Sequence, residues 1–539
     1  MMKKLYTAAM MMAAVLPVAA QDTYESARLL GSDLNGTARY VGMGGAMEAL
    51  GADISTISTN PAAIGLFRHS TASVSFGFVS QQDVQKFDGK DKTVMSFDQA
   101  GFVYSARLNR ASFVNFAFNY HKSRNFNQII SAANALSGCS QNGLTYHKAL
   151  NDIYYFDTNG PKSGGALPDA MGYYAPSQVS WAFSEADYLN ANVLMCDVAK
   201  HLENKDADWV YYNDAKAYSF DRAHRGWISN FDINISGNVN DRFYWGVTVG
   251  LKDVNYRGYS EYAETLVSYS KDPQGEPIGA VSIGDQRKIK GTGLDVTAGL
   301  IFRPIEASPF RIGLSIATPT WYDLSTSNDT YMLNSSSQGF WDNGHSNQDY
   351  DFKFYTPWKF GLSVGHTIGT QIALGASYEY SDFSTASNRV NKSDRYWYGD
   401  YGYSPSYIDE PMKKNTEKSL KGVHTLKAGV EFKPVPEMAV RFGYNYVSSP
   451  YEKDGMRDMT IDSPGVSYSS TTDYVNWQDT HRITCGLGYK VSGVNIDLAY
   501  QYNTTNGDFH PFQPYAGNSG VKEVSNKRHQ VLLTLGYTF

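Results

Sequence analysis

The sequence predicts an all-β membrane protein, a 14-stranded antiparallel transmembrane β-barrel with an N-terminal hatch, or plug, in its lumen. Three observations lead to this fold class. The last segment alternates between apolar and polar residues, the first segment is typical of an export signal, and the chain between them divides into alternating segments joined by short and long connections in turn.

Residues 531–539 are the most informative predicted strand of the chain. Every second residue is apolar, and Thr534, Gly536 and Thr538 on the opposite face are small or polar, so one face suits lipid and the other a lumen. The chain ends on Phe539, which we expect to form, with Tyr537, a C-terminal signal for the barrel-assembly machinery. An edge strand of a soluble sandwich is the alternative for this segment taken alone. The apolar face consists of Val531, Leu533, Leu535, Tyr537 and Phe539.

Residues 1–20 have the three parts of a secretory signal peptide. Lys3 and Lys4 precede an apolar run, and Val18-Ala-Ala20 supplies the small residues of a cleavage site. We therefore expect the mature chain to start near Gln21. The signal and the strand pattern together predict a bacterial outer-membrane location, because a closed barrel is the remaining way to span a membrane without a long apolar helix.

The segments with a period of two predict fourteen strands. Short turns rich in Asn, Asp, Pro or Ser alternate with connections of roughly 13 to 105 residues, as in barrels with periplasmic turns and extracellular loops. The longest connection, 123–227, is expected to be an extracellular loop within a barrel domain that spans 70–539. The predicted strands are 70–80, 94–108, 111–122, 228–240, 242–262, 288–304, 308–325, 352–369, 371–384, 419–433, 437–449, 479–490, 493–506 and 527–539.

Composition excludes some functions. The formal net charge of −6 argues against a nucleic-acid partner. The sequence has no His-Glu-x-x-His, P-loop or Cys-x-x-Cys motif, and its Gly-x-Ser-x-Gly match, Gly361–Gly365, lies inside the predicted strand 352–369 rather than at the strand-to-helix elbow of a hydrolase. The sequence therefore predicts no enzyme, no cofactor and no metal site. A hydrolase with a Ser–His pair that meets only in space is the alternative. Of three cysteines, Cys139 and Cys196 share one polar segment, and the sequence leaves open whether they form a disulfide.

Inward positions of the predicted strands carry charged side chains, which predicts a polar lumen. Several of these charges fall near the periplasmic ends of their strands and form a predicted charged belt. The belt is expected to anchor a plug; alternatively, one of its basic residues receives a substrate carboxylate. The predicted belt consists of Arg303, Arg311, Lys427, Glu431 and Arg441.

Residues 21–69 differ from the rest, with small residues and no long alternation. The spacing Gly42-x-Gly44 is close to a dinucleotide fingerprint, but the third glycine, the preceding strand and the βαβ unit are missing. We expect these small residues, Gly45 included, to permit close packing inside a barrel. Asp53 and Asn60 are expected to hold the hatch by side-chain hydrogen bonds, with Pro61 fixing its turn.

Two prolines predict irregular places in the wall. Pro319 and Pro357 fall toward the extracellular ends of two strands that the pattern makes neighbours. Because proline has no N–H to donate to a sheet ladder, both positions are expected to interrupt strand pairing.

At residues 51–67 the chain resembles the Asn-Pro-Ala hatch motif of the FadL/TodX outer-membrane transporters of hydrophobic compounds, as a Bacteroidetes-type member. Segments 309–323, 356–361, 378–383 and 480–489 are similar to later strands of that family. The 123–227 connection departs from it, and no individual ligand residue carries over.

The resemblance implies an outer-membrane channel for passive uptake of hydrophobic compounds such as long-chain fatty acids or aromatic hydrocarbons. The aromatic-rich 123–227 loop would capture the solute and Gly42–Gly51 would act as the moving gate. The partners implied are hydrophobic small molecules or lipids, outer-membrane lipid and the barrel-assembly machinery. The alternative is a FadL-like barrel that acts as a secretion-system shuttle and binds secreted protein cargo.

Overall fold

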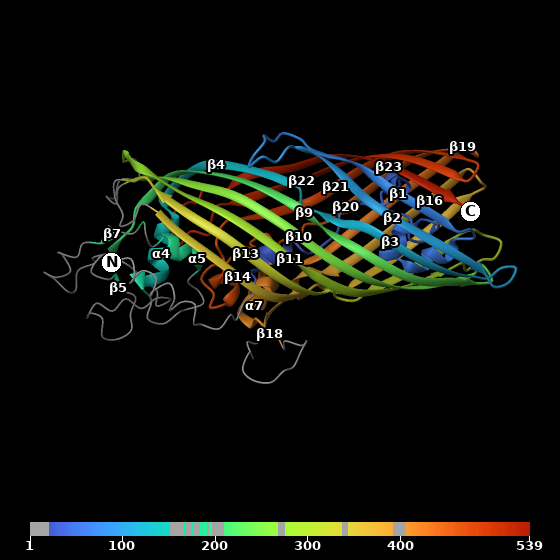
Figure 1. The fold of residues 1–539 in the computed structure, drawn as a ribbon, viewed down its shortest axis with the longest axis horizontal. Coiled ribbons are helices and arrows are strands. Elements are labelled where there is room, and N and C mark those ends of the chain that lie inside the picture. Colours follow the sequence, from blue (N-terminus) through green and yellow to red (C-terminus); the bar gives the residue numbers. More distant parts are fainter. Residues whose placement is uncertain are drawn as a thin grey trace.

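A computed structural model describes residues 21–150, 167–168, 174–175, 184–190, 193, 195–196, 210–267, 275–336, 343–391 and 406–539. Fourteen antiparallel passes of chain form one barrel, and the last strand closes it by pairing with the first from Thr71↔Thr538 to Gln81↔Arg528. Figure 1 shows the closed wall, with short turns at the end that holds the C-terminus and longer strands at the other.

Four of the passes are each divided into two strands, namely β3 with β4, β12 with β13, β14 with β15 and β16 with β17. The wall strands are β1 (Thr71–Gln81), β2 (Thr93–Arg107), β3 (Phe113–Asn125), β4 (Gln128–Cys139), β9 (Asp214–Val239), β10 (Phe243–Val267), β11 (Pro277–Phe302), β12 (Arg311–Ala317), β13 (Trp321–Asn334), β14 (Asn343–Tyr355), β15 (Lys359–Ile368), β16 (Ile372–Asp382), β17 (Ser387–Asn391), β19 (Gly422–Val435), β20 (Met438–Val447), β21 (Tyr474–Val491), β22 (Val494–His510) and β23 (Lys522–Thr538). Short strands β5 (Leu167–Pro168), β6 (Tyr174–Ala175), β7 (Met195–Cys196), β8 (Val210–Tyr211) and β18 (Ser406–Ile408) lie at the same end as the long connections.

All fourteen predicted strands are present, but several extend further toward the end with the long connections. β9 and β11 are each 26 residues long, and β4 with the start of β9 occupies parts of 123–227 that the sequence analysis expected to be loop. The alternation was hard to detect there because both faces of those extensions carry polar residues. In these extensions the strands form because they pair with a neighbouring strand, and no alternating lipid-facing pattern marks them in the sequence.

The two faces of the wall differ in chemistry. Large apolar side chains with more than a third of their surface exposed cover the outside, and buried polar residues face inward on the same strands. On β23, Val531 and Leu535 are exposed while Thr534 is buried. An apolar outer band on a closed barrel is what a bilayer-spanning barrel requires.

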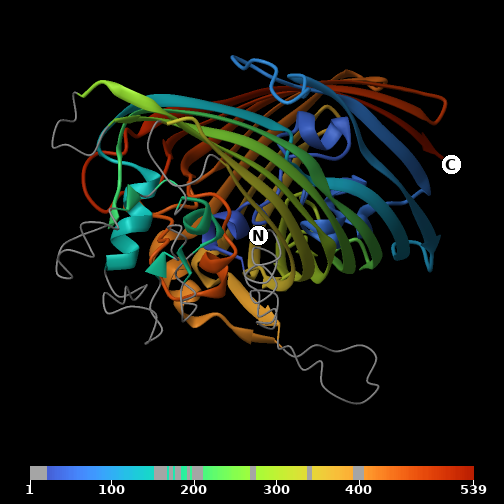
Figure 2. The same cartoon turned by 60° about the vertical axis from the view of Figure 1, so that its left-hand side comes forward.

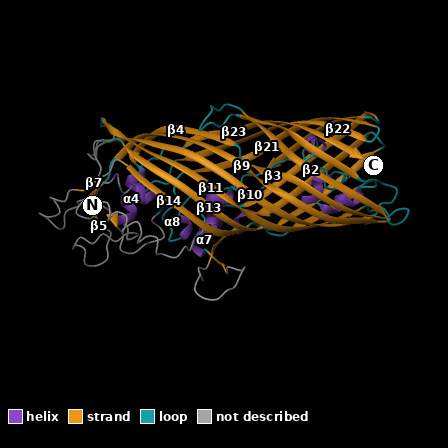
Figure 3. Cartoon of the chain, viewed as in Figure 1, coloured by secondary structure: helices purple, strands orange, loops and turns teal. Residues whose placement is uncertain are grey.

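Short helices occupy the interior and the mouth (Figure 3). The N-terminal ones are α2 (Thr23–Ala27), α3 (Ala38–Gly42), η1 (Ile54–Ser58) and η2 (Pro61–Leu66). Those toward the other end or in its connections are α4 (Gln141–Leu150), α5 (Glu185–Asn190), η4 (Phe383–Thr385), α7 (Glu410–Ser419) and α8 (Pro464–Ser467). None of the helices in the described part of the chain is both long and apolar enough to cross a membrane.

Candidate functional site

The N-terminal segment makes unusually close backbone contacts with the inner wall at residues 42–65, which we call the seated part. A methyl group on Gly375 would lie 1.9 Å from the Ala46 carbonyl oxygen, and one on Gly246 would lie 2.4 Å from that of Pro61. Only glycine permits this approach. Nine consecutive passes of the wall each contribute one glycine to these contacts, and we call the nine residues the glycine ring. They are Gly237, Gly246, Gly299, Gly313, Gly365, Gly375, Gly429, Gly443 and Gly486.

The glycines of the predicted hatch take part in this seating. Gly42 lies against Gly486, where an added methyl group would be 3.2 Å from the facing Cα. Gly44 has φ +64° and Gly45 has φ +82°, a left-handed conformation that other residues rarely adopt. A displacement of the whole 42–51 stretch would have to lift its backbone off the glycine ring.

Asp53 and Asn60 cap the two 3₁₀ helices of the seated part. The Asp53 carboxylate accepts hydrogen bonds from the Ser55 N–H at 3.0 Å and from the Thr37 hydroxyl at 2.8 Å and 2.9 Å. Asn60 Oδ1 accepts from the Ala62 N–H at 3.2 Å, and Pro61 is the first residue of η2. These caps satisfy backbone groups that the short helices would otherwise leave unpaired inside the barrel.

Two members of the predicted charged belt form one network with the seated part's neighbours. Glu431 accepts from Arg39 Nε at 3.0 Å and from Arg441 Nε at 2.6 Å, and Arg441 also contacts Asp497 at 2.5 Å. Glu431 and Arg441 are both almost fully buried from solvent. Because an unpaired charge in such a position is costly, the network ties α3 to the wall.

The remaining belt residues do not join that network directly. Lys427 pairs with Glu48 at 2.7 Å, and Arg311 donates to the Leu50 carbonyl oxygen at 3.1 Å, so both contact the N-terminal segment. Arg303 instead donates to the Ser308 carbonyl of its own turn, away from the segment. The structure thus brings four of the five predicted belt residues to the N-terminal segment and leaves Arg303 outside.

The start of the N-terminal segment is held by a second set of buried ion pairs. Asp22 contacts Arg457 at 2.8 Å, and Glu25 contacts Arg287 at 2.6 Å. These four side chains are all at most 3% exposed. Residues 22–25 are therefore fixed at their own end of the segment, independently of the seated part.

Between these two fixed ends, residues 28–35 border a cavity of about 330 Å³, and we call them the cavity-facing part. The cavity wall is amphipathic. It carries aromatic rings of Phe126, Tyr256, Tyr322, Phe383, Tyr451, Tyr474 and Trp477, and eight basic residues against four acidic ones. The basic residues are Arg28, Arg124, Arg222, Lys252, Lys359, Lys427, Arg482 and Arg528, and the acidic ones are Asp33, Asp295, Glu379 and Asp473.

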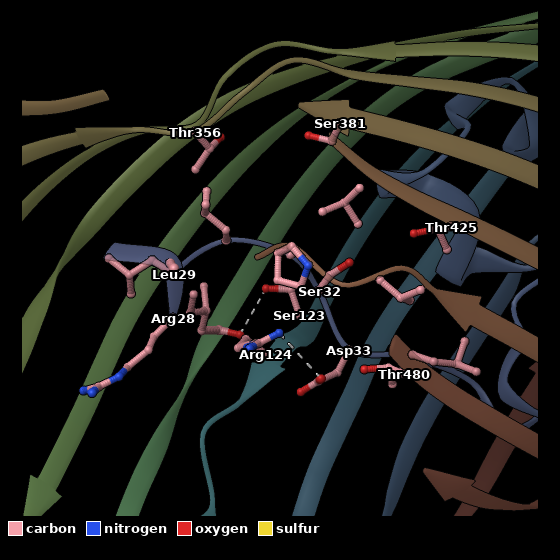
Figure 4. Close-up of a pocket in the computed structure, with 18 of the residues that line it drawn as sticks. Arg28, Leu29, Ser32, Asp33, Ser123, Arg124, Thr356, Ser381, Thr425 and Thr480 are labelled. Atoms are coloured by element: carbon pink, nitrogen blue, oxygen red, sulfur yellow. Dashed lines mark hydrogen bonds and ion pairs between the residues drawn. The ribbon is translucent and has the colours of Figure 1, made fainter. Parts of the chain in front are cut away.

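Asp33 lies among three arginines at this cavity. The distances from Asp33 Oδ1 are 3.9 Å to Arg124, 3.9 Å to Arg482 and 3.5 Å to Arg528. Figure 4 shows Arg124 pointing toward Asp33. Three guanidinium groups face one carboxylate, and Arg482 Nε is buried with no hydrogen-bond partner. This cluster, the guanidinium trio, has positive charge to spare for a second anionic group.

Beside the trio, the wall has a seam between β2 and β3. Ladder pairing of these strands ends at Gln99↔His121, although β2 begins at Thr93 and β3 continues to Asn125. Beyond that point the backbone N–H and C=O groups on the facing edges of β2 and β3 do not pair with each other. In a membrane such groups need other hydrogen-bond partners.

The cavity-facing part supplies those partners. The Asp33 N–H donates to the Ser123 carbonyl at 2.8 Å, and the Asn125 N–H donates to Asp33 Oδ2 at 2.8 Å. Asn35 Nδ2 donates both to Asp98 of β2 and to the Lys122 carbonyl of β3, each at 3.0 Å. Residues 33–35 therefore bridge the seam in place of a strand.

The prolines interrupt the wall as the sequence predicted. Pro319 lies between β12 and β13, and Pro357 lies between β14 and β15. Thr320 and Thr356 bridge the interruption through a backbone bond at 3.1 Å. The neighbouring pass is also broken, by η4, which the sequence analysis did not anticipate.

Helices α4 and α5 from the long connection lie at the end of the barrel away from the short turns, and we call them the cap (Figure 2). The Gln141 N–H at the start of α4 donates to Glu264 of β10 at 2.9 Å, and Glu185 of α5 accepts from Asn328 of β13. Lys148 and Asp187 link the two helices at 2.5 Å. Burial raises the pKa of Glu185 to about 7.

Two further predicted features can be located. Phe539 donates its N–H to the Ser70 carbonyl, and its ring lies outside the wall 6.0 Å from that of Tyr537. Cys139 is a free thiol that donates to the Asn518 carbonyl. The side chain of Cys196 lies outside the described residues.

Sequence reasoning missed Asp33, Asn35 and the guanidinium trio. Asp33 follows Ser32 in a short polar stretch without periodicity, and the three arginines come from three strands far apart in sequence. The signal that was present is the inward register of Arg482 and Arg528, but nothing in the sequence aligns those positions on one carboxylate.

Comparisons with known proteins give similarity at the level of solved structures. The chain is similar to the toluene transporter TbuX of Ralstonia pickettii, at 12% identity and TM-score 0.46 over 94% of this chain and 99% of that one. It is similar to a FadL homologue of Pseudomonas aeruginosa, at 13% identity and TM-score 0.46 over 97% and 99%. It is also similar to the monoaromatic hydrocarbon channel CymD, at 10% identity and TM-score 0.46 over 95% and 98%. No protein-family model and no curated protein matches the chain.

Proposed function

We propose that this protein is an outer-membrane channel for passive uptake of hydrophobic compounds, and that it favours those with an anionic head, such as long-chain fatty acids, over aromatic hydrocarbons. The observation that carries the proposal is the cavity, because one wall combines aromatic rings with an excess of basic side chains. An acyl chain gains by leaving water for the aromatic surface, and its carboxylate gains a guanidinium partner.

The guanidinium trio is the proposed site of the acid head. Asp33 is the only carboxylate recorded within 4 Å of Arg124, Arg482 and Arg528 among the described residues. A ligand carboxylate that pairs with these arginines would compete with Asp33. Competition of this kind couples arrival of the ligand to release of the cavity-facing part, because only a ligand that binds the released state better can shift the population.

The proposed exit is the seam between β2 and β3. Residues 33–35 bridge this seam by side-chain and backbone hydrogen bonds. Their withdrawal would open the wall sideways next to the trio. A sideways exit suits an oily solute, since it gains nothing by entering aqueous periplasm.

In this proposal the gate is the cavity-facing part rather than Gly42–Gly51. The seated part contacts wall backbone through the glycine ring, whereas residues 33–35 are held by a few polar bonds. The cap formed by α4 and α5, from the 123–227 connection, would form the capture side.

The test is a reversible crosslink. The pair Asn35→Cys and Asp98→Cys replaces side chains 3.0 Å apart and would pin the gate to the seam. In liposomes we expect oleate uptake to fall to background with the disulfide formed and to recover with reductant. The matched control is Ser80→Cys with Thr93→Cys, two wall side chains whose hydroxyl oxygens lie 2.7 Å apart, which should leave uptake unchanged.

Two outcomes would overturn the proposal. Full uptake by the oxidised Asn35–Asp98 pair would reject the gate. Failure of the unmodified protein to admit oleate, toluene or any other apolar solute would favour the protein-cargo alternative.

A further inference from the structure

One cluster of three side chains recurs three times on the outer face of the barrel. In each copy, two tyrosines two residues apart on one strand flank a histidine of the next strand. The upper tyrosine lies directly opposite the histidine in the pairs Tyr380↔His424, Tyr446↔His481 and Tyr502↔His529. We call these three clusters the Tyr–His belt.

The geometry of the three copies is the same. The lower tyrosine of each copy, Tyr378, Tyr444 or Tyr500, has its hydroxyl 2.8 Å from Nδ1 of the histidine. The ring centres of the upper tyrosine and the histidine are 5.1 Å, 5.4 Å and 5.0 Å apart. When the hydroxyl donates to Nδ1, the neutral ring carries its proton on Nε2, away from the tyrosine hydroxyl. At His529 this nitrogen lies 3.2 Å from Gln82 Oε1, which a phosphate oxygen would have to replace.

The copies also lie at one height on the barrel. A row here means the residues that are paired in turn from one strand to the next. Each row moves farther from the short-turn end with every strand. One such row starts at Ile368↔Ile372 and continues through Phe432, Val440, Leu487, Leu498 and Leu533. For strands tilted by about 35°, constant height requires a step back of about one residue per strand.

The belt makes that step. The row through His424 reaches Ser448, the residue after the end of β20, and Tyr446 lies two residues nearer the short-turn end. The row through His481 reaches Thr504 on β22, and Tyr502 again lies two residues nearer that end. Each copy spans two strands, so a shift of two residues keeps all three level.

This height corresponds to one rim of the apolar band. On β23 the exposed residues below His529 are apolar as far as Tyr537 and Phe539, which form an aromatic pair at the other rim. Ten residues separate His529 from Phe539, or about 25 Å along the barrel axis for a tilted strand, which is the height of the lipid-facing band. The belt therefore lies at the interface on the side of the long connections.

Within the described parts of the wall, the belt lies on one side of the barrel, from β16 to β23. On the other side the corresponding aromatic contacts are Phe97–Tyr120 at 5.5 Å and Tyr120–Phe231 at 5.3 Å, with no histidine among them. An aromatic girdle alone needs no imidazole, because tyrosine already suits an interface. The additional feature of the belt is a row of three imidazoles held by tyrosine hydroxyls.

We propose that the Tyr–His belt is a binding surface for the phosphate groups of outer-leaflet lipid A. At the outward-facing interface the phosphorylated head of that lipid meets the histidines, while its acyl chains cover the apolar side chains below, Leu426, Ile483 and Val531. A phosphate oxygen accepts hydrogen bonds from imidazole N–H groups and favours their charged form. The inference rests on the outer-membrane placement in the proposed function but not on uptake.

Neighbouring charges bear on the fit. Lys527 lies two residues above His529 on the same face and adds positive charge, 3.5 Å from Asp83. Asp479 accepts from the Tyr446 hydroxyl at 2.8 Å and from the Ser449 N–H at 2.7 Å. Because Gln82 Oε1 already lies 3.2 Å from His529 Nε2 and the Asp479 carboxylate lies beside the copy at His481, we expect the copy at His424 to contribute most.

The test compares lipid retention by native mass spectrometry. The full-length barrel in phosphatidylcholine nanodiscs is offered bisphosphorylated lipid A or the same lipid with its phosphates removed. We expect about tenfold greater retention of the phosphorylated form. In the triple variant His424→Phe, His481→Phe and His529→Phe, which keeps the aromatic rings, this preference should disappear while the barrel remains folded by gel mobility.

Three controls decide the outcome. Lysine at the three histidine positions should preserve the preference, whereas Tyr489→Phe with Tyr537→Phe at the other rim should not change it. Excess inorganic phosphate should not displace the lipid, since the acyl chains hold it. Equal retention of both lipids by the unmodified protein, or an intact preference in the triple phenylalanine variant, would overturn the proposal whether or not oleate is taken up.

Discussion

The seated part and the cavity-facing part of the N-terminal segment are neighbours in sequence but are held in different ways. Residues 42–65 contact wall backbone through the glycine ring and are fixed by buried ion pairs such as Lys427 with Glu48. Residues 28–35 border a cavity and reach the wall mainly through polar side chains. Local stability should differ accordingly, since regions with few packed contacts open first.

The largest effect should come from Arg441→Met. It leaves Glu431 and Asp497 without a partner that now lies 2.6 Å and 2.5 Å away. Breaking a buried pair from one side costs about 3–5 kcal/mol. We expect a lower melting temperature in detergent and faster hydrogen exchange in residues 38–51. Unchanged exchange there would show that the seated part does not depend on this network.

A similar loss, about 3 kcal/mol, is expected for Gly375→Ala, because the new methyl group would meet the Ala46 carbonyl oxygen. The matched control is Gly536→Ala, where the nearest atom is 3.6 Å away. Thermal unfolding of the two variants measures the difference. Equal stability would mean that the seated part can shift to make room, and that it is not fixed against the wall more firmly than residues 28–35.

A rise in pH from about 4.5 to above 7 should loosen the cap and leave the seated part unaffected. The folded-state pKa of Glu185 is about 7, above its ordinary 4.5, so its contribution to stability is complete below about pH 4.5 and is lost as pH rises through 7. The loss reaches at most about 3 kcal/mol. After division by the intrinsic exchange rate at each pH, the protection of 184–190 should fall between pH 5 and 8, and Glu185→Gln should reduce that fall.

The smallest effect on stability should come from Asn35→Ala, at about 1–2 kcal/mol for the loss of three partly exposed side-chain hydrogen bonds, to Asp98, Lys122 and Gln530. We expect faster hydrogen exchange in 28–36, no change in 42–65, and a higher rate of oleate uptake. Slower exchange in 28–36, or equal changes in both parts, would contradict the proposed gate.

Much of the wall could be predicted because each lipid-facing strand alternates between apolar residues toward lipid and polar residues toward the lumen. The alternation from Val531 to Phe539 and the turn at Asn240–Asp241 are local signals, and both prolines interrupt strands where expected. The charged belt was partly predictable, since Lys427, Glu431 and Arg441 have inward register. Membership of Arg303 in the belt stays a prediction, because its guanidinium donates to a carbonyl of its own turn and register alone does not tell which partner an inward side chain takes.

By itself the sequence determined the fold class, the strand order and the chemistry of each wall face, since a period of two and the turn residues depend only on neighbours along the chain. Tertiary structure alone decided what lies inside. The guanidinium trio joins β3, β21 and β23 on one carboxylate, and residues 33–35 bridge a seam whose ladder ends at His121. Those contacts depend on the barrel's closure and stagger, which set distances between residues hundreds of positions apart.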